Sequence, residues 1–301
     1  MKRYSEFLSP ERFCIFLFHG VITFNKWRVR NYKRKHLERN YFIRILDDLA
    51  ERGQAVTMEA IVAQKERGEK LPPYSFAISF DDGFLNNLTI AAPLLKERNM
   101  PAIFYLTTQF VNDNKMSWID TIESAVELSK GFDSASLAPV PSRWCETDQD
   151  KRWFLDQIRF WIKNSVSANA LELSEEIRRQ LHPQPLTLDP ELDTKMTWLE
   201  VNQLIQDPLF IIGGHSHTHR ILTFLSPPEL EWEIATSLSL LENKTGLRPR
   251  HYSYPEGLSH CYSEQVIETL RRHGIVCCPT AEDGTNDKDT DLYRLKRITV
   301  V

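Results

Sequence analysis

The sequence has no long uninterrupted run of apolar residues. Although 42% of its 301 residues are hydrophobic, no stretch approaches the roughly 20 apolar residues that a membrane-spanning helix needs. Residues 1–12 carry charges and a proline where a signal peptide would have an apolar core. The sequence therefore predicts a cytoplasmic protein without a transmembrane segment.

Cysteine is scarce, and neither sign of charge dominates. Five cysteines at irregular spacing favour reduced thiols over a framework of disulfides. The formal net charge of −4 provides no global positive field, which argues against binding to nucleic acid or anionic membranes. The basic stretch at residues 26–39 is a local exception. For it, a solvated loop followed by a helix is favoured over a phosphate-binding patch.

Short apolar runs alternate along the chain with segments of helical periodicity. This alternation predicts a parallel sheet or barrel with helices on its outside. In such folds the chemistry gathers at the carboxyl ends of the strands. The expected strands lie at residues 13–18, 55–57, 75–80, 102–106, 210–212, 252–254 and 275–277, and the expected helices at residues 41–52, 88–98, 227–242 and 263–273.

Residues 118–195 interrupt this alternation. Helical periodicity occurs at residues 119–128 and 153–162, with links that contain proline and serine. Because no change of composition marks a linker, we expect one domain over residues 1–301 with a helical insertion at about 118–195. Directly after the insertion, Thr197 and Glu200 have the spacing of a capping box, which predicts the start of a helix.

Two aspartates, Asp81 and Asp82, follow an apolar run and precede Gly83. Asp-Asp-Gly is a common turn sequence, because aspartate tolerates turn geometry and glycine accepts a positive φ. In a functional interpretation, Asp82 binds a metal ion and Asp81 accepts a proton from the attacking water. The pair alone favours the simple turn, so its meaning depends on a second segment of the chain.

Three of the nine histidines, His215, His217 and His219, fall within five positions. On a helical turn, a spacing of four puts His215 and His219 on one face with Cβ atoms about 5–6 Å apart, and His217 points elsewhere. We interpret His215 and His219 as metal ligands rather than as chance decoration of a polar loop. Together with Asp82 they leave open positions on a divalent ion, which is typical of a catalytic zinc site.

The two motifs together resemble those of the polysaccharide deacetylases, which are carbohydrate esterases related to chitooligosaccharide deacetylase. The resemblance implies an α/β fold, namely a distorted (β/α) barrel with about seven parallel strands, and a Zn²⁺ or similar divalent ion. It covers about residues 13–116 and 195–300. The matching segments are residues 79–83 (Ser-Phe-Asp-Asp-Gly), 196–198, 215–219 (His-Ser-x-x-His), 222–223 and 252–257, the last as a third motif.

The resemblance also implies roles for the matched residues. Asp81 would be the catalytic base, and Asp82, His215 and His219 would hold the metal ion. The ion would polarise the acetyl carbonyl and the attacking water, with a backbone N–H near residues 254–256 as a further oxyanion donor.

The chain departs from the family pattern at two places. Ser253 stands where the third motif usually has an arginine that orients the catalytic aspartate, and residues 295–297 (Leu-Lys-Arg) lack the usual histidine acid. A variant subset linked to surface-polysaccharide synthesis is similar in its Tyr-Pro-x-Gly motif, its Arg-Ile ending and a histidine after the first strand. Our hypothesis is that His19 replaces the missing acid and Arg297 the missing cation. A hydrogen-bonded, structural His19 is an equally weighted alternative.

Four residues are expected to contact the substrate. Tyr254 and Pro255 belong to the third motif, at the end of an expected strand, and Arg297 lies in the last motif. Trp118 stands at the head of the insertion, where its ring could stack on a sugar. Packing of the insertion is the favoured explanation for Trp118.

These observations predict a metal-dependent hydrolase that removes an N-acetyl group from a sugar in polysaccharide or glycolipid biosynthesis. The sugar would be free, lipid-linked or nucleotide-linked, and the oligomeric state is left open. The alternatives are hydrolysis of a non-sugar amide and a catalytically degenerate carbohydrate-binding protein. Intact Asp81, Asp82, His215 and His219 favour the enzyme, whereas Ser253 and the absent terminal histidine favour the binding protein.

Overall fold

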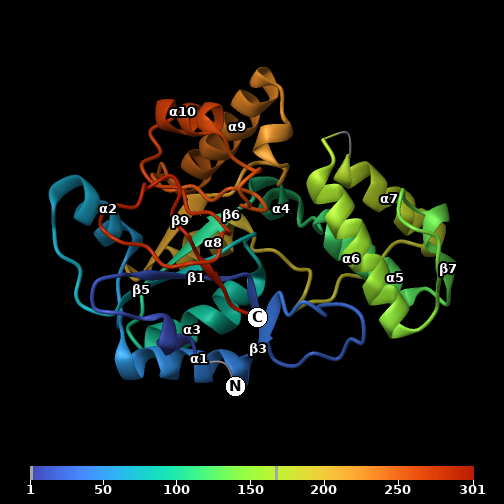
Figure 1. Cartoon of the computed structure of the whole chain (residues 1–301), viewed down its shortest axis with the longest axis horizontal. Coiled ribbons are helices and arrows are strands. Elements are labelled where there is room, and N and C mark those ends of the chain that lie inside the picture. The colour runs from blue at the N-terminus through green and yellow to red at the C-terminus, as the bar shows by residue number, and fades with distance from the viewer. Residues whose placement is uncertain (1–2, 167–168) are drawn as a thin grey trace.

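A parallel β-sheet forms the centre of the molecule (Figure 1). The computed structural model describes residues 3–166 and 169–301. The sheet has six strands in the order β10-β1-β5-β6-β9, with β4 also paired to β5, and every pair is parallel. Its strands are β1 (Cys14–Phe18), β4 (Gln54–Ala55), β5 (Ser75–Phe80), β6 (Ala102–Leu106), β9 (Phe210–Gly214) and β10 (Ile298–Thr299).

The central strands β1, β5 and β6 are buried at every residue, as expected for strands that are covered on both faces. On one face, Phe80 stacks between Phe18 and Phe104, with ring centroids 5.3 and 5.0 Å apart. Three helices and a π-helical turn cover this face and share its apolar core. They are α1 (Arg39–Arg52), η2 (Asn87–Ala91), α3 (Ala92–Glu97) and α8 (Trp198–Leu204).

The other face of the sheet looks into an open barrel. Single parallel bridges continue from β9 through Tyr252 and Cys277 to Leu295, which shortly precedes β10. The strands expected at residues 252–254 and 275–277 are thus reduced to isolated bridges. Pro255 and Pro279 lack the N–H that a longer ladder would need. Within the described residues, regular ladders do not close the sheet into a barrel.

Helices α9 (Pro227–Thr245) and α10 (Glu264–Arg272) lie where the periodicity predicts them, whereas α2 (Met58–Arg67) and α4 (Thr108–Asp113) were not predicted. Thr197 and Glu200 form the predicted capping box at the start of α8. Across residues 3–166 and 169–301, no helix has both the length and the apolar character to cross a bilayer. The five cysteines are free and buried, as predicted for reduced thiols. The other elements of this part are η1 (Tyr4–Phe7) and η4 (Leu222–Phe224).

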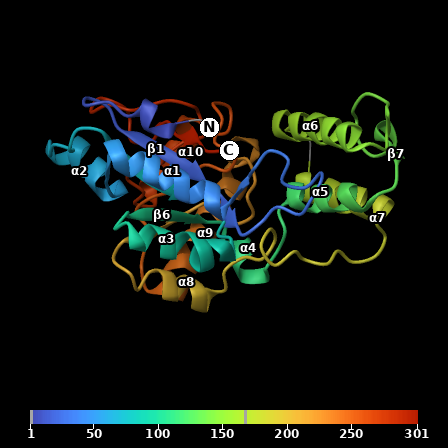
Figure 2. The same ribbon diagram turned by 90° about the horizontal axis from the view of Figure 1, so that it is seen from below.

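The helical segment at residues 118–195 lies to one side of the sheet in both views (Figures 1 and 2). It has an apolar core of its own, in which Ile122, Phe154, Ile158 and Ile177 are fully buried. Its assignment as an insertion within one domain stays a prediction. Its elements are α5 (Trp118–Leu128), β7 (Phe132–Asp133), η3 (Ser134–Ser136), β8 (Trp144–Cys145), α6 (Asp148–Asn164) and α7 (Ala170–Leu181).

The basic stretch packs against this segment. It belongs to the loop between β2 (Gly20–Ile22) and β3 (His36–Glu38), which pair in parallel. The backbone N–H groups of Val29 and Arg30 both donate to Glu127, at 2.7 and 2.9 Å, and Val29 is buried in the core of the segment. The prediction of a solvated loop is therefore wrong for the middle of this stretch, because carboxylates of α5 hold its backbone.

Candidate active site

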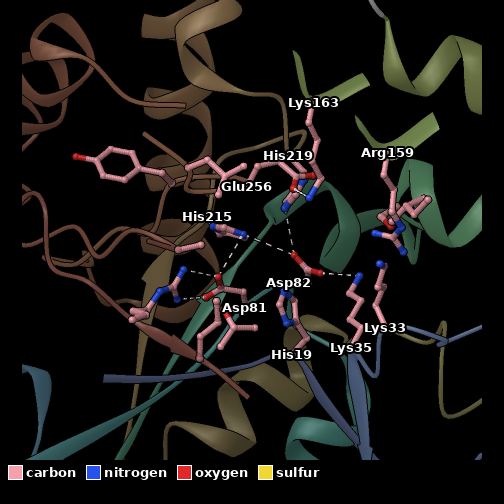
Figure 3. Close-up of a pocket in the computed structure, with 18 of the residues that line it drawn as sticks. His19, Lys33, Lys35, Asp81, Asp82, Arg159, Lys163, His215, His219 and Glu256 are labelled. Carbon is pink, nitrogen blue, oxygen red and sulfur yellow. Dashed lines mark hydrogen bonds and ion pairs between the residues drawn. The ribbon is translucent and has the colours of Figure 1, made fainter. Parts of the chain in front are cut away.

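Asp81 and Asp82 follow β5 directly, at the carboxyl edge of the sheet. Asp82 has a φ of 78° and Gly83 a φ of 84°, so the chain turns sharply there. The side chains of Asp81 and Asp82 reach the same cavity (Figure 3). A positive φ is costly for aspartate and is usually retained where a site needs it. The turn and the functional interpretation of this motif are thus compatible.

Asp81 is held by a buried arginine from the far end of the chain. Arg297 donates to both carboxylate oxygens of Asp81 at 2.8 Å. Its other N–H groups donate to Thr280 O, Ser79 Oγ and Ser253 Oγ. All five donors of the guanidinium are therefore used. Arg297 lines the cavity, and the expectation that it contacts substrate stays a prediction, whereas its expected role as the cation that orients Asp81 agrees with this geometry.

The same contacts set the charge of Asp81. Burial raises the pKa of this carboxyl, but Arg297 and His215 outweigh that effect and hold the pKa below its usual value. Asp81 is therefore ionised at neutral pH. The Nε2 atom of His215 lies 3.8 Å from its Oδ2 atom.

His215 and His219 come from the loop that follows β9. This loop is not helical, so the helical turn expected from their spacing is wrong. Instead, Ser216 and His219 adopt left-handed φ values of 64° and 63°, which fold the loop back and bring the two imidazole centroids to 4.9 Å. Gly214 allows the ring of Tyr252 to approach, since a Cβ atom there would lie 2.5 Å from it.

Three side chains from the two motifs converge. One ligand atom each from Asp82, His215 and His219 lies within 4.8 Å of the others. The buried Oδ1 atom of Asp82 has no hydrogen-bond partner among the described residues, although the Nε2 atoms of His215 and His219 lie 3.6 and 3.3 Å away. Ser253 O accepts a hydrogen bond from His215 Nδ1 at 2.8 Å, which leaves Nε2 free as a ligand. An unsatisfied carboxylate oxygen facing two such nitrogens fits a divalent metal ion.

Lys35 completes the surroundings of Asp82, and the sequence did not single it out. Its Nζ atom lies 3.0 Å from Asp82 Oδ2 and 3.4 Å from Asp120. Burial lowers the pKa of Lys35, but these two carboxylates outweigh it and raise the pKa above its usual value. Lys35 therefore carries a charge that holds one oxygen of Asp82 and leaves the other to the histidines. The only signal in the sequence was its place in the basic stretch.

His19 follows β1 and lines the same cavity. Its imidazole makes no hydrogen bond within residues 3–166 and 169–301, which speaks against a hydrogen-bonded structural role. Burial lowers its pKa to about 4, with Asp82 opposing and Lys35 adding to that shift. The ring is therefore neutral at neutral pH.

The cavity has a volume of about 370 Å³ and lies between the strand ends and the helical segment. Trp118, Arg159 and Lys163 reach it from α5 and α6. Trp118, Lys163 and His219 also line an adjoining cavity of about 210 Å³. Trp118 is also buried in the core of the helical segment, so it both packs within that segment and lines the cavity.

The other expected site residues differ in position. Tyr254 lines the larger cavity, but its hydroxyl donates to Tyr293 O at 3.0 Å and so is already engaged. Pro255 is buried and is not among the residues that line the cavity. His217 points elsewhere, as expected, with its ring against Trp232 at 5.2 Å.

A family model described as polysaccharide deacetylase matches residues 158–278, which include β9 and both histidines. YxkH of Bacillus subtilis (strain 168), provisionally assigned to the polysaccharide deacetylases, is 29% identical over 89 residues. These residues are 30% of this chain and 31% of YxkH, so the match spans less than a third of that relative.

Solved structures share the fold over nearly the whole chain. IcaB from Ammonifex degensii has a TM-score of 0.62 at 16% identity, covering 98% of this chain and 94% of IcaB. The Streptococcus pyogenes deacetylase PplD, solved with acetate, has a TM-score of 0.62 at 13% identity, covering 97% and 94%. The BpsB deacetylase domain from Bordetella bronchiseptica has a TM-score of 0.56 at 16% identity, covering 97% of each chain.

The structural matches establish an α/β fold with a parallel sheet that is shared with deacetylases. The family match and the two motifs go further, since they agree on the segment that supplies both histidines. The resemblance predicted from the motifs is thereby confirmed: the chain is similar to the polysaccharide deacetylases in its motifs, over residues 158–278 that the family model matches, and in its fold.

Proposed function

We propose that this protein is a metal-dependent hydrolase that removes the N-acetyl group from a sugar. One observation carries the proposal. The unsatisfied Oδ1 atom of Asp82 faces two histidine nitrogens, beside an ionised aspartate that is clamped by Arg297. Asp82, His215 and His219 would hold the ion. When bound, a divalent ion supplies Lewis acidity that polarises the acetyl carbonyl and eases deprotonation of water.

Asp81 acts as the general base in this proposal. Its carboxylate is fixed in one orientation by the two hydrogen bonds from Arg297, and Ser253 Oγ lies 3.4 Å from its Oδ2 atom. A carboxylate held at hydrogen-bond reach of the attacking water can take its proton without rearrangement. The arginine that the third motif lacks is thus replaced in space by one from the last motif.

His19 acts on the leaving amine. Because its pKa is lowered to about 4, the imidazole is neutral before turnover, so in this proposal it takes up the proton that Asp81 removed from the attacking water and passes it to the leaving amine. The backbone N–H of Tyr254 donates to none of the described residues, and it is therefore free to stabilise negative charge on the acetyl oxygen.

The degenerate binding protein is less well supported. That alternative rested on Ser253 and on the missing terminal histidine, and Arg297 and His19 offer replacements for both losses. Hydrolysis of a non-sugar amide keeps the same catalytic residues, and no particular contact favours it. We retain the proposal of one domain over residues 1–301, with a role in polysaccharide or glycolipid biosynthesis.

Acetate release is the direct test of this function. Purified protein is incubated with N-acetylated sugars that are free, lipid-linked, nucleotide-linked or polymeric, with and without a chelator, and its metal content is measured. We expect about one divalent ion per chain, acetate release in at least one arm, and loss of that release with chelator. Release that is indifferent to the chelator would refute the metal-dependent mechanism, and activity on polymer alone would refute a precursor substrate.

A further inference from the structure

The proposed substrate cavity has a cationic wall on the side formed by the helical segment and the loop between β2 and β3. We use "cationic wall" for Lys33, Arg159 and Lys163, which all line the cavity. Figure 3 shows Lys33 and Arg159 on the same side of the cavity as Lys35, with Lys163 above the metal ligands. The proposed deacetylation of a neutral sugar does not require these positive charges.

Most of the N–H donors of Arg159 have no acceptor among the described residues. Within residues 3–166 and 169–301 its one hydrogen bond runs from Nη2 to Glu123, so four of its five N–H bonds have no protein acceptor. Glu123 belongs to α5 and does not line the cavity. Tyr32 supports the guanidinium from another side, with its ring centroid 5.6 Å away. The carboxylate and the ring therefore hold Arg159 in place from outside the cavity.

Lys33 follows the same pattern. Its Nζ atom lies 2.7 Å from Asp156 Oδ1, and Asp156 does not line the cavity. Lys163 differs, because its partner Glu256 lines the cavity with it. Two of the three cations thus line the cavity while their carboxylate partners lie outside it.

The carboxylates that do face the cavity are already engaged. Arg297 binds Asp81 through two hydrogen bonds, Lys35 and the proposed ion share Asp82, and Lys163 pairs with Glu256. Lys33 and Arg159 remain without an opposite charge inside the cavity. Such an excess attracts an anionic group on the ligand.

The residue types favour phosphate over carboxylate. The planar fork of arginine matches two phosphate oxygens, and lysine supplies a point charge to a third. A single carboxylate would need only one such partner, whereas a phosphate carries nearly two negative charges at neutral pH. Two cations whose carboxylate partners lie outside the cavity, with Lys163 nearby, therefore match phosphate in both charge and number of acceptors.

We propose that the cationic wall binds a phosphate group carried by the N-acetyl sugar that this enzyme deacetylates. The inference rests on the proposed function and names its substrate class, a sugar phosphate ester. The phosphate could join the sugar to a nucleotide, to a polyprenyl lipid or to nothing further. All three share the chemistry that Arg159 and Lys33 recognise.

Binding of a product-like probe tests the wall apart from catalysis. Glucosamine 1-phosphate and glucosamine have no acetyl group to lose, so calorimetry on the full chain measures their affinities directly. We expect the phosphate form to bind about tenfold or more tightly, since one charge-assisted contact of this kind contributes roughly a factor of ten. Arg159→Gln should remove most of this preference and leave the affinity for glucosamine unchanged.

Two further variants test whether the effect of Arg159→Gln comes from the lost charge and not from a loss of folding. Lys33→Gln removes a charge from an exposed side chain and should weaken the preference without loss of folding, which Arg159→Gln risks because it leaves Glu123 unpaired. Lys130→Gln changes an exposed lysine after α5 that lies outside both cavities, and it should match wild type. Equal affinity for both probes, or a preference that survives Arg159→Gln and Lys33→Gln, would overturn the proposal.

Kinetics then identify the source of the phosphate. Acetate release is compared for N-acetylglucosamine 1-phosphate, its uridine diphosphate ester, a short prenyl diphosphate ester and an oligosaccharide with uronic acids. Faster release from any phosphate ester than from neutral N-acetylglucosamine supports the proposal, and the fastest arm names the carrier. A preference for the uronic acid arm refutes it. Absence of release in every arm, with the binding preference intact, would reject deacetylation and spare the phosphate site.

Discussion

The two walls of the cavity are built in different ways. On one side, Asp81, Asp82, His215 and His19 all follow strands. Asp82 lies at a left-handed turn, and buried hydrogen bonds hold Asp81 and His215. On the other side, cations project from α6 and from a loop. The strand-end wall is rigid and carries groups suited to chemistry, whereas the helical wall carries groups suited to recognition.

The two walls also differ in how freely their residues could change. The strand ends are fixed by the pairing of β1, β5, β6 and β9, so a catalytic residue there can move little. The helical segment has its own core and can change its surface without disturbing that pairing. We infer that reaction type resides in the first wall and substrate choice in the second.

The largest expected effect lies in the strand-end wall. Asp81→Asn should lower acetate release by about 10³-fold, within the usual range for loss of a general base, while metal content stays near wild type. Asp82→Asn should lose the metal and the activity together. Metal analysis and initial rates on both variants check this. Equal metal loss in the two variants would contradict the division of labour between these neighbours, and Asp113→Asn on the surface is the control.

His19→Asn tests the other catalytic group of the same wall. If the imidazole serves the leaving amine, turnover should fall by roughly 10²-fold with metal content and folding unchanged. Initial rates, metal analysis and circular dichroism measure these three quantities. A folded variant with a near-unchanged rate would end this assignment.

Lys35 stands where the two walls meet, so its loss tests their connection. Lys35→Met should free Asp82 Oδ2 and weaken metal affinity by about 10- to 100-fold, as is common for partners of metal ligands. Competition with a coloured chelator measures the affinity. Lys33→Met, two positions away, should leave it unchanged. Equal losses in both variants would mean that general positive charge, and not the contact with Asp82, supports the site.

Replacement of Trp118 tests the helical wall, and of these variants we expect it to have the smallest effect on activity. Trp118→Leu should raise KM by about three- to tenfold, the range of a lost aromatic contact, with a smaller change in kcat. Trp144→Leu is the matched control in the same segment, since Trp144 is 62% exposed and outside the cavities. A fall in kcat alone would place Trp118 among the residues that shape the catalytic side.

Much of the strand-end wall was predictable. The buried runs gave β5 and β6 with their bounds, and the capping box gave the start of α8. The pairing of Asp82 with His215 and His219 followed from residue types that bind metal. The strands expected at residues 252–254 and 275–277 failed, because apolar composition cannot tell a ladder from a single bridge beside a proline.

The sequence by itself supplied the proposed catalytic residues, since two carboxylates and two imidazoles in motifs after apolar runs are the residue types that a catalytic metal site uses. Only the tertiary structure decided which distant residues serve them. The sequence offered Arg297 as the missing cation, and the fold shows its contact with Asp81. Lys35, which contacts Asp82, and Arg159, which lines the cavity from a helix with no motif, were not singled out by the sequence. Such contacts depend on how the sheet, the loop and the helices pack, and residue spacing does not encode that packing.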